Sequence, residues 1–388
     1  MQQVAQGWLV LELTGDPFAL GVVGAAQFLP VLFLGLFGGV VADALPKRTS
    51  LLVTQAVSMG QAVVLGLLTI SGSVEVWHVF VMALVLGTAN AFDMPIRQAM
   101  VVETVDRDDV ASAVALNSAV FNGARIVGPA VAGLLIGIVG LAACFFINAA
   151  SDAAVIVALL RIRPGELTSP PRDIPERTAR AVLEHLAAGL VYVRRTPAVL
   201  VTVFVVGVVS ASALNFHVTL PLIARDLLAG GPETFGFLAA ASGAGSLASA
   251  VVMAFGGRAT LGRALLGAAV IGAATTATAF SGWLPASLVL MFIVGWGLIA
   301  MAATTNTIIQ LTTPDGLRGR VMAVYTTVFA GSSPVGNVAV GALAARFGVG
   351  AALIAGGLVA LACAGLVTLW ALRTRQGLRR FRDRPAPG

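Results

Sequence analysis

The chain has 388 residues, of which 58% are hydrophobic and 11% are charged, and its mean hydropathy is +0.94. Soluble domains usually contain about 25% charged residues, so this composition predicts an integral membrane protein. The net charge of +6 does not indicate nucleic-acid binding, because the basic residues lie in short gaps between apolar runs.

A helix needs roughly 20 apolar residues to cross a bilayer. The first apolar run, residues 1–13, is too short for this, so we expect an incomplete first helix that either begins inside the membrane or continues upstream. An even number of spans favours the second alternative. Eleven complete spans are predicted at 17–42, 50–71, 76–97, 110–138, 141–161, 197–221, 233–255, 260–281, 284–308, 318–345 and 349–372.

The basic residues predict the orientation of these spans. All 24 Lys and Arg residues lie in alternate gaps or in the C-terminal tail, except Arg225, Arg346 and Arg125. Basic loops stay on the cytoplasmic side of a membrane, which predicts a cytoplasmic C-terminus.

Two stretches 208 residues apart, 120–135 and 328–343, share Val, Phe and Gly at matching positions. This spacing predicts an all-α membrane protein of two six-helix bundles related by a parallel repeat, as in many secondary transporters. The predicted domains are a half at 1–161 with a short first helix, a linker at 162–196 with an amphipathic helix, a second half at 197–372 and a basic cytoplasmic tail at 373–388. The helix in the linker is either a tether or a regulatory element.

The segment GGVVADALPKR at 38–48 places Gly39, Asp43 and Lys47 four residues apart, followed by Arg48. It resembles the signature loop of the major facilitator superfamily, Gly-x-x-x-Asp-x-x-x-Arg/Lys. Small residues allow helices to approach closely, and basic residues suit the headgroup region. The resemblance implies an inner gate, and we expect Arg97 to form an ion pair with Asp43 there.

Further segments resemble the twelve-span drug:proton antiporter branch of this superfamily, which includes the enterobactin exporter and macrolide efflux proteins. They are QGWLVLELTGDP (6–17), ANAFDMPIRQA (89–99), NGARIVGPAVAG (122–133) and LRGRVMAVY (317–325). Gly128, Pro129 and Gly133 resemble the antiporter motif of that branch, which implies export. The same residues also fit a simple glycine-rich packing face.

Ionisable groups inside a membrane are costly and usually functional. Arg125 lies near the middle of its span and Asp152 about halfway along the next, so we expect these two residues to pair. The alternative is that Arg125 lies beside the substrate path. Asp93 is a third candidate for coupling.

The resemblance implies that spans 1, 4, 7 and 10 line the central cavity, so polar residues on these spans are candidates for contact with the substrate. The candidates are Gln6, Asn90, Asn215, His217, Asn306 and Gln310. His217 is alternatively a residue at the outer end of a helix.

These features predict a secondary transporter that exports small amphipathic compounds, drugs or siderophore-like molecules, by proton antiport. The alternatives are an uptake permease for a small nutrient and an inactive, shortened member. The sequence has no phosphate-binding loop, nucleophile elbow or metal-ligand spacing, so we expect no enzyme activity, cofactor or metal. The expected partners are a small-molecule substrate, protons and the lipid bilayer, with no nucleic acid. We expect a monomer in a bacterial inner membrane.

Overall fold

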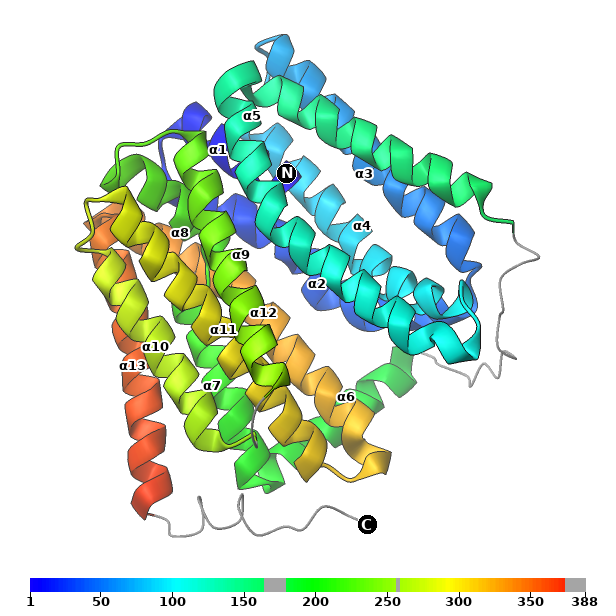
Figure 1. The fold of residues 1–388 in the computed structure, drawn as a ribbon, viewed down its shortest axis with the longest axis vertical. Helices are drawn as coiled ribbons and strands as arrows, with labels where there is room; N and C mark the ends of the chain where they lie inside the picture. The colour runs from blue at the N-terminus through cyan, green and yellow to red at the C-terminus, as the bar shows by residue number, and fades with distance from the viewer. Residues whose placement is uncertain (164–178, 256–258, 374–388) are drawn as a thin grey trace.

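A computed structural model describes residues 1–163, 179–255 and 259–373, and every regular element in these ranges is a helix. The predicted all-α membrane fold is thereby confirmed (Figure 1). The first half contains α1 (Gln2–Thr14), α2 (Pro17–Ala44), α3 (Lys47–Ile70), α4 (Val76–Glu103), the turn η1 (Arg107–Asp109) and α5 (Val110–Arg161).

The second half follows a connecting helix, α6 (Ala179–Arg195). It contains α7 (Pro197–Ala213), α8 (Phe216–Leu222), η3 (Ile223–Leu227), α9 (Pro232–Ala254), α10 (Leu261–Thr278), α11 (Leu284–Thr312), α12 (Asp315–Phe347) and α13 (Val349–Arg373).

The membrane spans occur where the hydropathy predicts them. Ten described helices are long and apolar enough to cross a bilayer, and one of them, α5, covers two of the eleven predicted spans. Its two arms meet at Gly140, which has a φ of 84° and a ψ of 171°, so the chain turns there without a loop. Glycine adopts this conformation without the steric cost that a side chain would bring. The first helix, α1, has only 13 residues, as expected.

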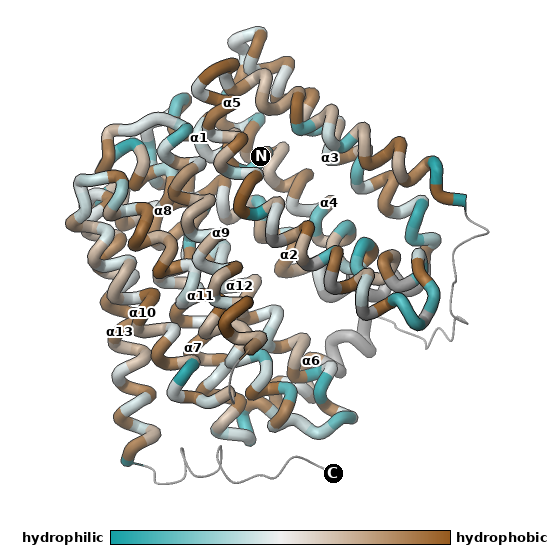
Figure 2. Tube along the Cα trace, viewed as in Figure 1, coloured by the Kyte–Doolittle hydropathy of each residue, from teal (hydrophilic) through white to brown (hydrophobic). Residues whose placement is uncertain are grey.

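The helices run between two ends of the molecule. We name the end that carries the α2–α3, α4–α5 and α11–α12 connections the basic end, because Lys47, Arg48 and Arg318 lie there. The opposite end, with the α1–α2, α3–α4 and α12–α13 connections, is the far end. Figure 2 shows apolar residues along most of the helices and hydrophilic residues mainly near the connections.

The two halves meet at two helix crossings, each with a glycine on both helices. In the first, the α5 residues Pro129 and Gly133 face Gly236 of α9. A Cβ on Gly236 would lie 2.5 Å from the Pro129 carbonyl oxygen and 3.0 Å from Gly133 Cα. Only the absence of side chains at both glycines permits so close an approach.

In the second crossing, α12 packs on α2. A Cβ on Gly21 would lie 2.5 Å from the Asn337 carbonyl oxygen, and one on Gly341 would lie 3.0 Å from Gly21 Cα. Gly133 and Gly341 are equivalent in the predicted repeat, so the repeat has a physical role in joining the halves. The helices that pack on these glycines, α2 and α9, share the pattern Pro-x-x-x-Gly, at 17–21 and 232–236.

Both crossings lie toward the far end. Toward the basic end, α5 and α9 expose large apolar side chains, including Val120 (64% exposed) and Phe255 (88% exposed). The glycine-mediated contacts between the halves therefore do not extend along the full length of these helices.

The predicted linker helix is present as α6. It packs on α12, where the backbone at Gly189 abuts the Arg320 carbonyl oxygen, and it also contacts the end of α11, where the Tyr192 hydroxyl donates to the Thr312 carbonyl oxygen at 3.1 Å. The Pro-rich part of the linker, 164–178, and the tail beyond 373 lie outside the described residues.

Candidate transport site and gate

The basic residues of the signature loop join helices within the first half. Lys47 forms an ion pair with Glu103, a buried residue at the end of α4. Arg48 donates to the carbonyl oxygens of Leu159 and Leu160, at 2.8 and 3.1 Å. These carbonyls belong to the last turn of α5, where the backbone lacks helical partners and a cation is favoured. The loop thus ties α3 to the ends of α4 and α5.

The predicted ion pair between Asp43 and Arg97 stays a prediction, because the side chain of Asp43 lies outside the described part of the chain. Arg97 instead donates to Asp93, one turn earlier on α4, at 3.0 and 3.2 Å.

Asp93 is the most extensively hydrogen-bonded carboxylate inside the described spans. Besides Arg97, the buried side chains of Thr54 and Gln55 on α3 donate to it, both at 2.9 Å. The Asp93 side chain is only 14% exposed, so these bonds replace most of its hydration.

The predicted pair of Arg125 and Asp152 is wrong. No hydrogen bond or ion pair joins them in the structure, and Asp152 accepts a bond of 3.3 Å from Asn148 on its own helix. The charges that act on Asp152 include those of Asp93 and Arg97. The two α5 arms are joined by a tight turn, but Arg125 and Asp152 have different neighbours: His217 for Arg125, and Asn148, Asp93 and Arg97 for Asp152.

Arg125 faces the second half of the molecule. Its backbone lies at the α5–α9 contact, where a Cβ on Gly243 would be 3.2 Å from the Arg125 carbonyl oxygen. Its charge acts on His217 of α8, and the His217 ring packs against Phe28 of α2 with centroids 4.9 Å apart. Arg125 forms no hydrogen bond or ion pair with any described residue. The arrangement favours the alternative of a position beside the substrate path.

The helix carrying His217 is broken at the preceding residues. α7 ends at Ala213, and α8 starts at Phe216. The Asn215 side chain donates to the Ala211 carbonyl at 2.8 Å, which satisfies one backbone group freed by the break. His217 is therefore at a helix start, although it lies inside the protein beside α2 and not at the outer surface.

Several buried amides around this break have atoms without hydrogen-bond partners. They include Asn215 Oδ1, Gln27 Nε2 and both side-chain polar atoms of Asn337 and Gln6. Each of these side chains is less than 7% exposed. Buried polar groups are normally paired, so this group is chemically unusual.

The other polar candidates are more dispersed. Asn90 is half-buried on α4, and exposed Gln310 donates to Asn306 at 2.5 Å near the last turn of α11. Of the antiporter motif, Pro129 and Gly133 form the α5–α9 crossing, while a Cβ on Gly128 would have no neighbour within 4 Å. Their roles as cavity or motif residues stay predictions.

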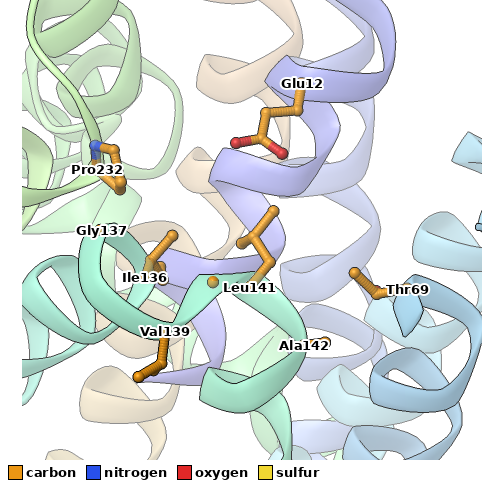
Figure 3. Close-up of a pocket in the computed structure, with 9 residues that line it drawn as sticks. Glu12, Thr69, Ile136, Gly137, Val139, Leu141, Ala142 and Pro232 are labelled. Carbon is orange, nitrogen blue, oxygen red and sulfur yellow. The ribbon is translucent and has the colours of Figure 1, made fainter.

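A pocket of about 460 Å³ opens at the far end, around the Gly140 turn (Figure 3). Figure 3 shows Glu12 of α1 above it and Thr69 and Pro232 on opposite sides. Glu12 accepts a hydrogen bond from Trp8 at 2.8 Å. None of the predicted site residues lines this pocket.

Sequence reasoning missed Glu103, Thr54, Gln55, Gln27 and Asn337. Gln27 and Asn337 could have been found, because each amide lies one to two helical turns from a glycine of the α2–α12 crossing, Gly21 or Gly341. The partners of Lys47 and Asp93 had no such signal, because they depend on which helices become neighbours.

The fold and the inward-facing polar groups define a polytopic membrane transporter. The chain belongs to the transmembrane secretion effector family of the major facilitator superfamily, whose model matches residues 1–381. Since this family and its relatives are transporters, the chain is not an enzyme.

The relatives are transporters of different substrates. The chain is 31% identical to the multidrug efflux pump Tap of Mycolicibacterium fortuitum, over 96% of this chain and 92% of the relative. It is 24% identical to the staphyloferrin A transporter of Staphylococcus aureus, over 65% and 62% of the two chains. The fold is similar to that of the nucleoside transporter NupG, with a TM-score of 0.77, 10% identity and coverage of 95% and 94%.

Proposed function

We propose that this chain exports small amphipathic compounds, drugs or siderophore-like molecules, by proton antiport with alternating access. The observation that carries the proposal is the placement of charged groups on the two arms of α5, which meet at Gly140. Arg125 on the first arm faces the second half, and Asp152 on the second arm lies near Asp93 and Arg97 of the first half. The relationship to a multidrug efflux pump supports the direction of transport.

Asp152 and Asp93 are the proposed proton-coupling groups. Asp93 is held by three side chains, whereas Asp152 has a single hydrogen bond from Asn148. Two carboxylates near each other inside a membrane repel when both are charged, which favours uptake of a proton by one of them. When that proton is released, both carboxylates are charged, and the Arg97 guanidinium would interact with Asp93 and Asp152 together.

Gly39, Asp43, Lys47, Arg48 and Arg97 form the proposed gate at the basic end. We infer that this end is cytoplasmic, because basic loops remain on that side, and that the C-terminus lies there too. We further propose that the protein works as a monomer in a bacterial inner membrane. The halves as described contact each other toward the far end, which corresponds to a cytoplasm-facing state of the transport cycle.

Proteoliposomes with an imposed pH gradient test this proposal. We expect uphill movement of a fluorescent amphipathic dye that collapses with a protonophore and does not respond to a sodium gradient. Asp152→Asn should abolish uphill movement while retaining exchange of dye down its own gradient. The matched control is Asp315→Asn, since the Asp315 side chain is 90% exposed at the basic end.

Uphill transport in the Asp152→Asn variant at the rate of the unmodified protein would contradict the coupling role. Accumulation of dye in the opposite direction would favour an uptake permease. Failure of every variant and of the unmodified chain to move any dye would favour an inactive member.

A further inference from the structure

None of the residues that the structure describes supplies a counter-ion for Arg125. It has no ion pair or hydrogen bond there, and its charge acts on His217, which cannot supply a negative charge. The candidate carboxylates lie elsewhere. Asp152 is directed toward Asp93 and Arg97 in the first half, and Glu233 of α9 lies against Gly137, twelve residues along α5 from Arg125.

An uncompensated arginine in a membrane span is costly, so it is retained where a ligand or the transport cycle supplies the missing charge. Its planar guanidinium offers a fork of donors that matches a carboxylate or phosphate group. Arg125 is exposed in the structure, so an anionic group can reach it, and a lipophilic cation brought to the same distance would be repelled.

Unpaired amides lie on the other elements around this position. Asn215 precedes His217 by two residues, and Gln27 precedes Phe28, whose ring contacts His217. The Asn337 amide lies against α2 at Gly24, one turn before Phe28. These three amides are buried to at least 94%, and each has a polar atom without a partner. A molecule that reaches them when the halves separate would meet polar atoms that have no protein partner.

We propose that the substrate is an amphipathic compound with a carboxylate or similar anionic group, which binds Arg125 while its polar part meets the amides of Gln27, Asn215 and Asn337. The inference rests on the proposed function and narrows its substrate class. The rings of Phe28 and His217, tilted by 58° to each other, provide aromatic contacts for the apolar portion. Lipophilic cations without an acidic group are weak ligands of this site.

Two dyes that differ in one group test the charge preference. Rhodamine 110 carries a free carboxylate, and rhodamine 123 is its methyl ester. Binding of each dye to the full-length protein in nanodiscs is measured by fluorescence anisotropy, with no pH gradient present. We expect the carboxylate dye to bind at least about tenfold more tightly than the ester, as one charge-assisted hydrogen bond would provide.

The variant Arg125→Gln should bring the two affinities together, while Arg125→Lys should restore part of the preference. The control Arg346→Gln removes an arginine at the far end and should leave the preference unchanged. Equal binding of both dyes to the unmodified protein, or tighter binding of the ester, would overturn the proposal without reference to any variant. A preference that persists in a folded Arg125→Gln protein would also overturn it.

Dye binding in nanodiscs tests the anion site, and dye movement in proteoliposomes tests the proposed export. Selective binding of the carboxylate dye without movement across proteoliposomes supports the anion site and contradicts export of this dye by proton antiport. Proton-driven movement of both dyes with equal affinity supports antiport and contradicts the anion site.

Discussion

The α5–α9 crossing provides a direct test of the contact between the halves. In Gly236→Ala, the added methyl group would lie 2.5 Å from the Pro129 carbonyl oxygen, about 0.9 Å inside the 3.4 Å at which ordinary contact begins. Its other neighbours, Gly133 Cα and N at 3.0 and 3.2 Å, are also backbone atoms that cannot rotate away. The helices must separate, and overpacking of this kind costs about 1–3 kcal/mol.

This cost applies to the state in which the far ends are in contact. A difference of about 1.4 kcal/mol changes a two-state equilibrium tenfold, so the variant should shift the population toward states with separated far ends. Spin labels at Ser73→Cys, in the α3–α4 connection, and Gly282→Cys, in the α10–α11 connection, report the separation of the far ends by pulsed electron resonance. We expect the distance distribution to move to longer values in Gly236→Ala.

The matched control is Gly128→Ala, on the same helix as Gly133, because a Cβ at Gly128 meets nothing within 4 Å. Unchanged distances in Gly236→Ala, together with an unchanged thermal midpoint, would refute the reasoning. An equal shift in Gly128→Ala would attribute the effect to helix rigidity and not to the crossing.

Three further substitutions test individual contacts. Arg48→Gln removes the donors at the last turn of α5, so the thermal midpoint in detergent should fall, by a loss of about 1–3 kcal/mol, while Arg48→Lys should recover part of it. Gly336→Ala places a methyl group against the Ala211 carbonyl oxygen and the Asn215 side chain and should lower the midpoint by a similar amount, which Asn215→Ser should partly reverse because it relieves only the second contact. Thr54→Val removes one of the donors to Asp93 at nearly constant volume, and we expect slower proton-coupled transport with normal protein yield; an unchanged rate would count against a role for this bond.

The fold was predictable because it depends on properties that the sequence displays directly. The length of apolar runs fixes which segments span the membrane, and the alternation of basic gaps restricts their order. Even the linker helix could be predicted, since apolar residues at helical spacing lie beside charges in 179–195.

The contacts of the charged residues were less predictable. Depth in the membrane follows from position in a span, and on that criterion Arg125 and Asp152 are plausible partners. Pairing also requires that the two helices turn these side chains toward each other, and this rotation is set by packing against helices distant in sequence. The Arg125 arm packs against Gly243 of α9, and no local pattern in the first half of the chain reveals that contact.

The turn at Gly140 also has a mechanical consequence. Because no loop separates the two arms of α5, we expect a movement of one arm to move the other. Under the proposed function, a ligand that draws Arg125 toward the second half would move the arm carrying Asp152, 27 residues along the chain. Substrate and proton would then influence each other through the turn at Gly140, without a direct bond between the two side chains.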